Sequence, residues 1–230
     1  MQYEFGAKSD VGKIRANNED SYKIAQNFAI VADGMGGHQK GEVASALAVE
    51  IISDFISDKK CSVVQAIDAS NKEIYKKSQK KEFLGMGTTV VMCLMENDKA
   101  IFANVGDSRG YMFSQGKLEQ VTKDHSLVQK LIDDGEITEA EAEKREDKSV
   151  ILRAVGADKD VTVDVFEKDV VSGDVIMLCS DGLSNSVKND EIALILNGED
   201  SLQKKAERLV ETANKNGGYD NITVVLLKIC

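Results

Sequence analysis

One stretch, residues 28–37, reads FAIVADGMGG and contains the sharpest change of pattern in the chain. Five apolar residues, Phe28 to Ala32, run into an acid and a series of glycines. This pattern is typical of a buried strand that enters a tight loop. Apolar residues then recur at helical spacing and predict an amphipathic helix over about 42–58. The stretch therefore predicts a strand, a glycine loop and a helix in immediate succession.

Beyond this stretch, groups of consecutive strand-like runs alternate with groups of helical patterns. Strands are predicted at 88–95, 99–105, 110–114, 117–121, 161–166, 175–179 and 222–229, and helices at 63–80, 126–134, 190–196 and 202–214. Asn97-Asp98 and Gln115-Gly116 supply hairpin turns. Hairpins, as opposed to regular βαβ units, predict an α+β fold with antiparallel sheets. With no linker or repeat in view, residues 1–230 are expected to form a single domain.

The charge balance excludes several classes of partner. The 230-residue chain carries 29 Lys and Arg against 39 Asp and Glu, a formal net charge of −10. Phosphate contacts need clustered cations, so nucleic acid is not expected as a partner. No basic and apolar leader opens the sequence, and no apolar run approaches the roughly 18–20 residues that span a bilayer. Because the 4 cysteines form no CxxC pair, we expect a reducing, cytoplasmic environment without a membrane anchor.

Acidic residues stand at the ends of predicted strands, each with glycine beside it or close by. These residues are Asp33, Asp107, Asp181 and Asp220. Carboxylates gathered at one rim of a sheet would repel one another unless a cation lay between them, and Mg²⁺ or Mn²⁺ suits such oxygen ligands. A single Asp-Gly pair is more often a turn former. Four such positions, with Asn18-Glu19-Asp20 near the start, shift the balance toward a metal centre.

Spacing excludes three other ways of handling phosphate. Gly6 to Lys13 is not a P-loop, because five residues separate its glycines and Ile14 replaces the required Ser or Thr. No cysteine is followed at the sixth position by arginine, which excludes a Cys-x5-Arg nucleophile. Asp33-Gly34-Met35 lacks the second aspartate of the enzymes that form an aspartyl-phosphate.

A set of short strings, in order along the chain, carries a more specific signal. They are RANNED (15–20), VADGMGGH (31–38), GTT (87–89), VGDSRGY (105–111), TKDHSLV (122–128), RAVG (153–156), CSDGL (179–183) and GGYDNITV (217–224). Together they resemble the metal-dependent protein serine/threonine phosphatases of the PP2C (PPM) family, in their bacterial single-domain form. The resemblance covers nearly the whole chain. It implies an α+β, four-layer α/β/β/α sandwich with two central antiparallel sheets.

The resemblance also implies a two-metal centre at one edge of the sheets, with Mn²⁺ or Mg²⁺ as cofactor. In matching positions, Asp33 bridges both ions, and Gly34 offers a backbone carbonyl to the second. Asp181 and Asp220 complete the first ion's ligands. A single carboxylate with two oxygens can bridge ions that lie about 3.5–4 Å apart.

Two further residues take catalytic roles by the same resemblance. Glu19 acts largely through a metal-bound water, and Arg15 holds the substrate phosphate, since a planar guanidinium matches two phosphate oxygens. The implied mechanism is direct hydrolysis by a metal-bridging hydroxide, without a phosphoenzyme.

Bacterial members often bind a third, weaker metal. Matching positions assign it to Asp107, Asp181 and Ser149. The charged segment at about 132–148 matches the family's flap insertion beside this third site.

The chain departs from the family pattern in two places. Animal members carry a histidine proposed as general acid where Met35 stands here, and a thioether cannot donate a proton. His38 is a candidate for that role, and a purely loop-shaping role for His38 is the equal alternative. Many bacterial relatives have His-Pro where this chain reads Arg145-Glu146, so its flap lacks a proline that relatives often carry.

The resemblance thus implies a phosphatase of phosphoserine and phosphothreonine in proteins. Its partners would be phosphorylated proteins and a cognate bacterial Ser/Thr kinase, and the protein would act as a monomer. Two alternatives stay open: a catalytically silent phosphoprotein-binding module of the same fold, and a dedicated phosphatase of a single regulator. The presence of Asp33, Asp181 and Asp220 favours the enzyme.

Overall fold

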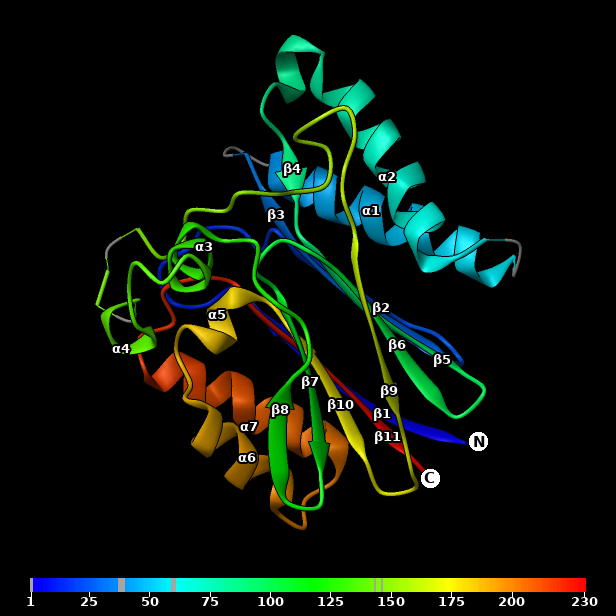
Figure 1. The fold of residues 1–230 in the computed structure, drawn as a ribbon, viewed down its shortest axis with the longest axis vertical. Coiled ribbons are helices and arrows are strands. Elements are labelled where there is room, and N and C mark those ends of the chain that lie inside the picture. Colours follow the sequence, from blue (N-terminus) through cyan, green and yellow to red (C-terminus); the bar gives the residue numbers. More distant parts are fainter. Residues whose placement is uncertain (1, 37–39, 59–60, 143, 146) are drawn as a thin grey trace.

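Two antiparallel sheets form the centre of the molecule (Figure 1). The computed structural model describes residues 2–36, 40–58, 61–142, 144–145 and 147–230. The first sheet has the order β1 (Tyr3–Asp10), β11 (Ile222–Ile229), β10 (Val175–Cys179), β7 (Arg109–Ser114) and β8 (Lys117–Gln120). The second has the order β2 (Asp20–Ile24), β3 (Phe28–Met35), β5 (Val90–Glu96), β6 (Lys99–Val105) and β9 (Asp164–Asp169), with the short β4 (Gly87–Thr88) paired to β3.

Helices cover the outer face of each sheet (Figure 1). The second sheet is covered by α1 (Lys40–Ser57) and α2 (Val63–Ser78), which is followed by the 3₁₀ turn η1 (Lys81–Phe83). The first sheet is covered by α5 (Asp181–Ser184), α6 (Asn189–Asn197) and α7 (Leu202–Lys215). Two short helices, α3 (Leu127–Asp133) and α4 (Glu139–Ala142), lie at one end of the sheets. Among the helices that the described residues form, none has the length and apolarity to cross a membrane.

Three apolar cores separate the layers. In β11, Leu226 packs under α7 whereas its neighbour Leu227 faces the other sheet, as the period-two geometry of a strand requires. Leu178 and Val91 fill the space between the sheets, and Ile52 of α1 packs on the second sheet. This arrangement confirms the four-layer α/β/β/α sandwich and the α+β class.

Hairpin turns and helix caps follow the sequence closely. Asn97 and Asp98 have φ of 47° and 62°, and Gln115 and Gly116 have φ of 50° and 78°. Positive φ at both central residues matches the right-handed twist of the flanking strands, which confirms both predicted hairpins.

Two predicted strands differ from the structure. The run at 88–95 is broken at Thr89, whose backbone turns to bond Asp33, so that β4 and β5 are separate strands. The strand predicted at 161–166 begins only at Asp164. Its early apolar residues, Val161 and Val163, pack against the core under α1 and α2 without joining the ladder. The edge strand β2 and the four-residue helix α5 were not predicted.

The predicted flap segment, 132–148, contains the end of α3, the helix α4 and connecting turns. Thr138 and Glu141 form a capping box, because the Glu141 carboxylate accepts from Thr138 N at 2.8 Å and Glu141 N donates to Thr138 Oγ1 at 3.3 Å. Ser126 caps α3, and Gly135 takes a φ of 73° just beyond it. The segment lies against the same end of the sheets at which the acidic residues of the candidate site gather.

Candidate metal centre

Four aspartates meet at one edge of the two sheets. Asp33 lies near the end of β3, Asp107 follows β6, Asp181 follows β10, and Asp220 precedes β11. Antiparallel pairing of β10 with β11 places the end of one beside the start of the other, since Cys179 is the register partner of Val224. The proximity is electrostatic as well as topological: burial raises the pKa of Asp33 well above its usual value, and the other three aspartates raise it further.

The backbone of Asp33 is fixed by two consecutive threonines. Asp33 N donates to Thr89 Oγ1 at 3.0 Å, while Asp33 O accepts from Thr89 N at 2.8 Å and from Thr88 Oγ1 at 2.9 Å. The Thr89 hydroxyl also bonds Ser108 Oγ at 2.7 Å, next to Asp107. The Gly-Thr-Thr string therefore ties the strand end that carries Asp33 to the loop that carries Asp107.

Gly34 is required by close packing of backbone on backbone. A Cβ at this position would lie 2.1 Å from Gly41 O and 2.7 Å from Glu19 O. The Gly34 N–H donates to Glu19 O at 3.1 Å. Glycine here lets the start of α1 close on β3 and brings the segment carrying Glu19 against Asp33.

Asp181 has one carboxylate oxygen that is hydrogen-bonded and one that is not. Asn185, four residues on across α5, donates from Nδ2 to Asp181 Oδ2 at 2.9 Å. The other oxygen, Oδ1, is buried and finds no hydrogen-bond partner among the described residues. Burial, followed by the charge of Asp220, raises the pKa of Asp181 to about 6.

Asp20 is the register partner of Asp33 in the pairing of β2 with β3. As in Asp181, one of its two carboxylate oxygens is hydrogen-bonded and the other is not. Its Oδ2 accepts from Ser180 Oγ at 2.7 Å, and Ser180 Oγ accepts in turn from Thr223 N at 2.9 Å. Within the part of the chain that the structure describes, Asp20 Oδ1 has no partner. Burial raises the pKa of Asp20 to about 7, although the bonds from Thr223 and Ser180 oppose the shift.

Asp107 is the third aspartate that has a buried carboxylate oxygen without a hydrogen-bond partner among the described residues. Its side chain is buried, and its Oδ1 has no partner in the described ranges. Burial, followed by the charges of Asp181 and Asp124, raises its pKa to about 8. Arg109 lowers it only partly, because Arg109 is engaged in a forked ion pair with Asp124 at 2.7–3.0 Å.

His125 supports the Asp107 loop from behind. Its Nδ1 accepts from Gly106 N at 3.0 Å, so the neutral ring carries its proton on Nε2, which lies 3.2 Å from Asp164 Oδ2. Burial lowers the pKa of His125. Both ring nitrogens are thus engaged, which makes His125 a structural support for the loop that carries Asp107.

Arg15 lies at the rim of the site and pairs with Asp220, Nη2 to Oδ2 at 2.7 Å. Half of the Arg15 side chain is exposed (51%), so it can reach an incoming anion. Asn221 holds the segment that carries both Arg15 and Glu19: its Oδ1 accepts from Glu19 N at 2.8 Å, and its Nδ2 donates to Asn17 O at 2.9 Å.

The chemistry of this edge fits divalent cations. Buried carboxylates with raised pKa values favour protons or cations over free charge, and three of them keep a buried oxygen that has no hydrogen-bond partner among the described residues. Hard cations with oxygen ligands satisfy both conditions. In the residues described, however, no three His, Cys, Asp or Glu side chains already form a closed metal-binding group.

One predicted site residue has no hydrogen bond to this group, and another lies outside the described residues. Ser149 is exposed in a turn, and among the described residues it makes no hydrogen bond to Asp107 or Asp181. His38 lies outside the described residues. Sequence reasoning missed the positioning roles of Asp20, Asn185 and Asn221. The string Asp220-Asn221 pointed to the last of these, but the i to i+4 spacing of Asp181 and Asn185 was informative only once α5 was known.

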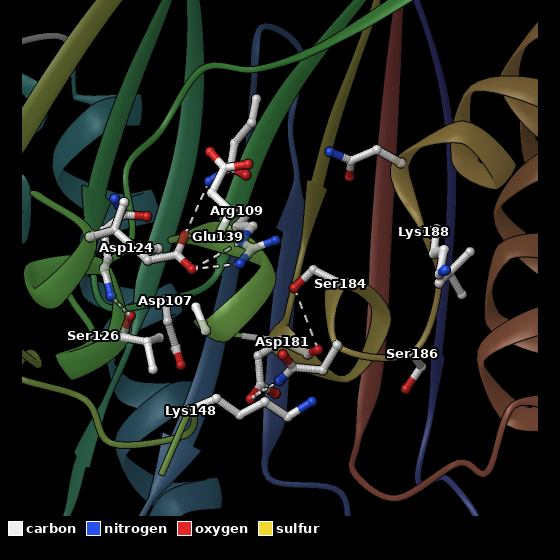
Figure 2. Close-up of a pocket in the computed structure, with 18 of the residues that line it drawn as sticks. Asp107, Arg109, Asp124, Ser126, Glu139, Lys148, Asp181, Ser184, Ser186 and Lys188 are labelled. Carbon is white, nitrogen blue, oxygen red and sulfur yellow. Dashed lines mark hydrogen bonds and ion pairs between the residues drawn. The ribbon is translucent and has the colours of Figure 1, made fainter. Parts of the chain in front are cut away.

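A cavity of about 730 Å³ opens beside Asp107 and Asp181. Figure 2 shows Asp181 near the centre of the view, with Asp107 and Ser126 on one side and Ser186 and Lys188 on the other. The cavity lies between the α3–α4 segment and the α5–α6 loop, so it joins the carboxylate edge to the surface.

Comparison with known proteins agrees with this geometry. Residues 15–226 match the family "Protein phosphatase 2C". The chain is 40% identical to the serine/threonine phosphatase stp of Listeria monocytogenes serotype 4b, over 99% of this chain and 96% of that one. The crystal structure of the Mycobacterium tuberculosis serine/threonine phosphatase PstP/Ppp has a TM-score of 0.93 and 36% identity, covering 100% of this chain and 99% of that one.

A second similar structure contains bound metal ions. The catalytic domain of the serine/threonine protein phosphatase PstP in complex with 2 manganese ions has a TM-score of 0.87 and 36% identity, covering 99% of this chain and 98% of that one. The family match extends over all four aspartates and the ordered strings around them. The chain belongs to the protein phosphatase 2C family.

Proposed function

We propose that the protein hydrolyses phosphoserine and phosphothreonine in other proteins, as a metal-dependent serine/threonine phosphatase. The observation that carries the proposal is the edge at which Asp33, Asp107, Asp181 and Asp220 meet, where two of them keep a buried oxygen without a hydrogen-bond partner among the described residues. The naming of relatives as serine/threonine phosphatases supports the substrate class.

Two Mn²⁺ or Mg²⁺ ions are the proposed cofactors, in keeping with the two manganese ions of the PstP catalytic domain. Asp33 would bridge them, Asp181 and Asp220 would complete one, and the Gly34 carbonyl would serve the other. When bound, such ions generate a nucleophile from water at neutral pH and act as Lewis acids toward phosphate oxygens. Asp107, with Asp181 and Ser149, is the proposed third site.

The chain's own residues bind and orient the phosphate. Arg15 would exchange its contact with Asp220 for two phosphate oxygens, which a guanidinium can bind as a fork. Glu19, held through its backbone by Asn221 and Gly34, would orient a metal-bound water. Hydrolysis is direct, without a phosphoenzyme. Met35 cannot protonate the leaving group, and His38 stays the candidate for that step.

The proposed setting is the cytoplasm, where the protein would act as a monomer on phosphorylated proteins and on a cognate Ser/Thr kinase. A net charge of −10 gives no basis for binding nucleic acid. A phosphatase dedicated to one regulator would have the same site, so substrate profiling has to separate the two cases.

Hydrolysis of a phosphothreonine peptide, with Mn²⁺ titrated against EDTA, tests the proposal. We expect metal-dependent phosphate release from the wild type, and background release from Asp33→Asn. Lys80→Ala serves as the matched control, because Lys80 is exposed and directly precedes η1. This variant should release phosphate at the wild-type rate. Release that survives EDTA would exclude the metal mechanism. Peptide binding without release would instead support a silent binding module.

A further inference from the structure

The cavity beside the metal centre has two walls of different origin. The α3–α4 segment contributes Val128, Ile132 and Ala142, and the α5–α6 loop contributes the residues from Ser184 to Asp190. At about 730 Å³ it exceeds what one phosphate group fills, and it leads directly away from Asp107 and Asp181. Side chains that flank a phosphorylated residue would enter it.

Two exposed lysines line this cavity. Lys188, at the start of α6, and Lys148, in the flap segment, both line it and are both exposed. Figure 2 shows them on different sides of Asp181. Across the described part of the chain neither makes an ion pair or a side-chain hydrogen bond, so both are available to a ligand. The remaining cation, Arg109, is already engaged by Asp124.

The carboxylates that line the cavity differ in what offsets their negative charge. Asp107 and Asp181 belong to the proposed metal sites, and Asp124 is neutralised by Arg109. Asp190 lies in the first turn of the nine-residue α6, where the helix dipole favours a negative charge. Among the described lining residues, Asp190 and Glu139, on the exposed start of α4, then stand against the two lysines. Outside the proposed metal sites and the Arg109–Asp124 pair, the described lining thus offers two unpaired ammonium groups to an acidic side chain, although the protein as a whole is acidic.

We propose that this cavity is a specificity subsite for acidic side chains near the phosphorylated residue, with Lys188 and Lys148 as its determinants. The inference rests on the proposed phosphatase function and names the class of substrate that it favours. Each lysine would form an ion pair at a solvated rim. Such a pair changes kcat/KM by about 2- to 5-fold and weakens with added salt.

The test compares three phosphothreonine peptides of equal length, flanked by neutral residues, by glutamates or by lysines. The wild type should give the highest kcat/KM with the acidic peptide and the lowest with the basic one. In Lys148→Ala/Lys188→Ala, the ratio of kcat/KM for the acidic to the neutral peptide should fall about 5- to 10-fold, chiefly through KM. Lys80→Ala, which removes an exposed lysine outside the cavity, should keep the wild-type ratio.

Two results would overturn the subsite: a wild-type preference for the basic peptide, or an unchanged ratio in the double variant. Adding about 0.5 M salt should shrink the ratio in the wild type but hardly affect the double variant. If no peptide is hydrolysed at all, the proposed function fails. Peptide binding measured by fluorescence anisotropy then decides on the subsite, since the double variant must lose its preference for the acidic peptide if the lysines read it.

Discussion

The space between the sheets and the edge of the same sheets are both shielded from water, but they are built from opposite chemistry. Between the sheets, Val91, Leu178 and Val225 fill the space with side chains that need no partner. At the edge, Asp20, Asp107 and Asp181 each keep an oxygen that is unpartnered among the described residues. Packing alone stabilises the first region, whereas the second reaches its lowest free energy only with cations.

Truncating the inter-sheet core should give the largest change in stability. Leu178 is fully buried, so Leu178→Ala is expected to lower the free energy of unfolding by about 2–5 kcal/mol, through lost transfer energy and a cavity. Because this core makes no use of ions, the loss should be equal in Mn²⁺ and in EDTA. Urea unfolding in both buffers measures it, and a loss confined to one buffer would mean that the two regions are not independent.

The second prediction concerns the residue that orients a metal ligand. Asn185→Ala removes the 2.9 Å bond to Asp181 Oδ2 and should weaken Mn²⁺ binding by about 10- to 100-fold. Isothermal titration calorimetry measures the affinity. Ser184→Ala is the control, because the Ser184 hydroxyl donates to the Asp181 backbone carbonyl, at 3.5 Å, and not to its carboxylate. Equal affinities in the two variants would show that Asn185 does not position the ligand.

The third prediction concerns the effect of pH on the stability of the metal-free protein. The pKa values of Asp181, Asp20 and Asp107 are raised to about 6, 7 and 8 by burial, so their folded forms favour protonation. This stabilisation is fully present below the unfolded pKa of about 3.9 and is lost as pH rises through the folded values. Urea midpoints measured in EDTA should therefore fall between pH 5 and pH 8.

Asp20→Asn tests the origin of that slope. Since the amide does not titrate, the variant should show a shallower fall in midpoint than the wild type over the same pH range. A urea midpoint that rises with pH in the wild type, or an unchanged slope in the variant, would show that the buried carboxylates at this edge do not cause the pH dependence of stability.

The sequence predicted those parts of the fold in which the pattern is local. The strand at Ile222–Ile229 has the predicted bounds, because its apolar run is long and begins shortly after a glycine-rich turn. The edge strand β2 escaped notice because DSYKI is mostly polar and has only one buried residue. The break at Thr89 depends on bonds to Asp33, 56 residues away, which no local pattern records.

The candidate site divides in the same way. Asp33, Asp107, Asp181 and Asp220 could be chosen because strand ends and glycines mark them, and a resemblance over ordered strings assigned their roles. The residues that hold them could not be chosen. Ser180 bonds Asp20 across 160 residues, and Asn185 reaches Asp181 only through a helix of four residues. Positioning contacts of this kind follow from the assembled fold.

The central claim is that the carboxylate edge is destabilised without cations and stabilised by them. Thermal unfolding of Asp33→Asn and of the wild type, each in EDTA and in Mn²⁺, tests it most directly. In EDTA the variant should unfold at a higher temperature than the wild type, since one buried carboxylate that burial and its neighbours disfavour is gone. Mn²⁺ should raise the wild-type Tm by an amount that grows with Mn²⁺ concentration and leave the variant nearly unmoved. A lower Tm for the variant in EDTA, or an equal rise in both proteins, would contradict the claim.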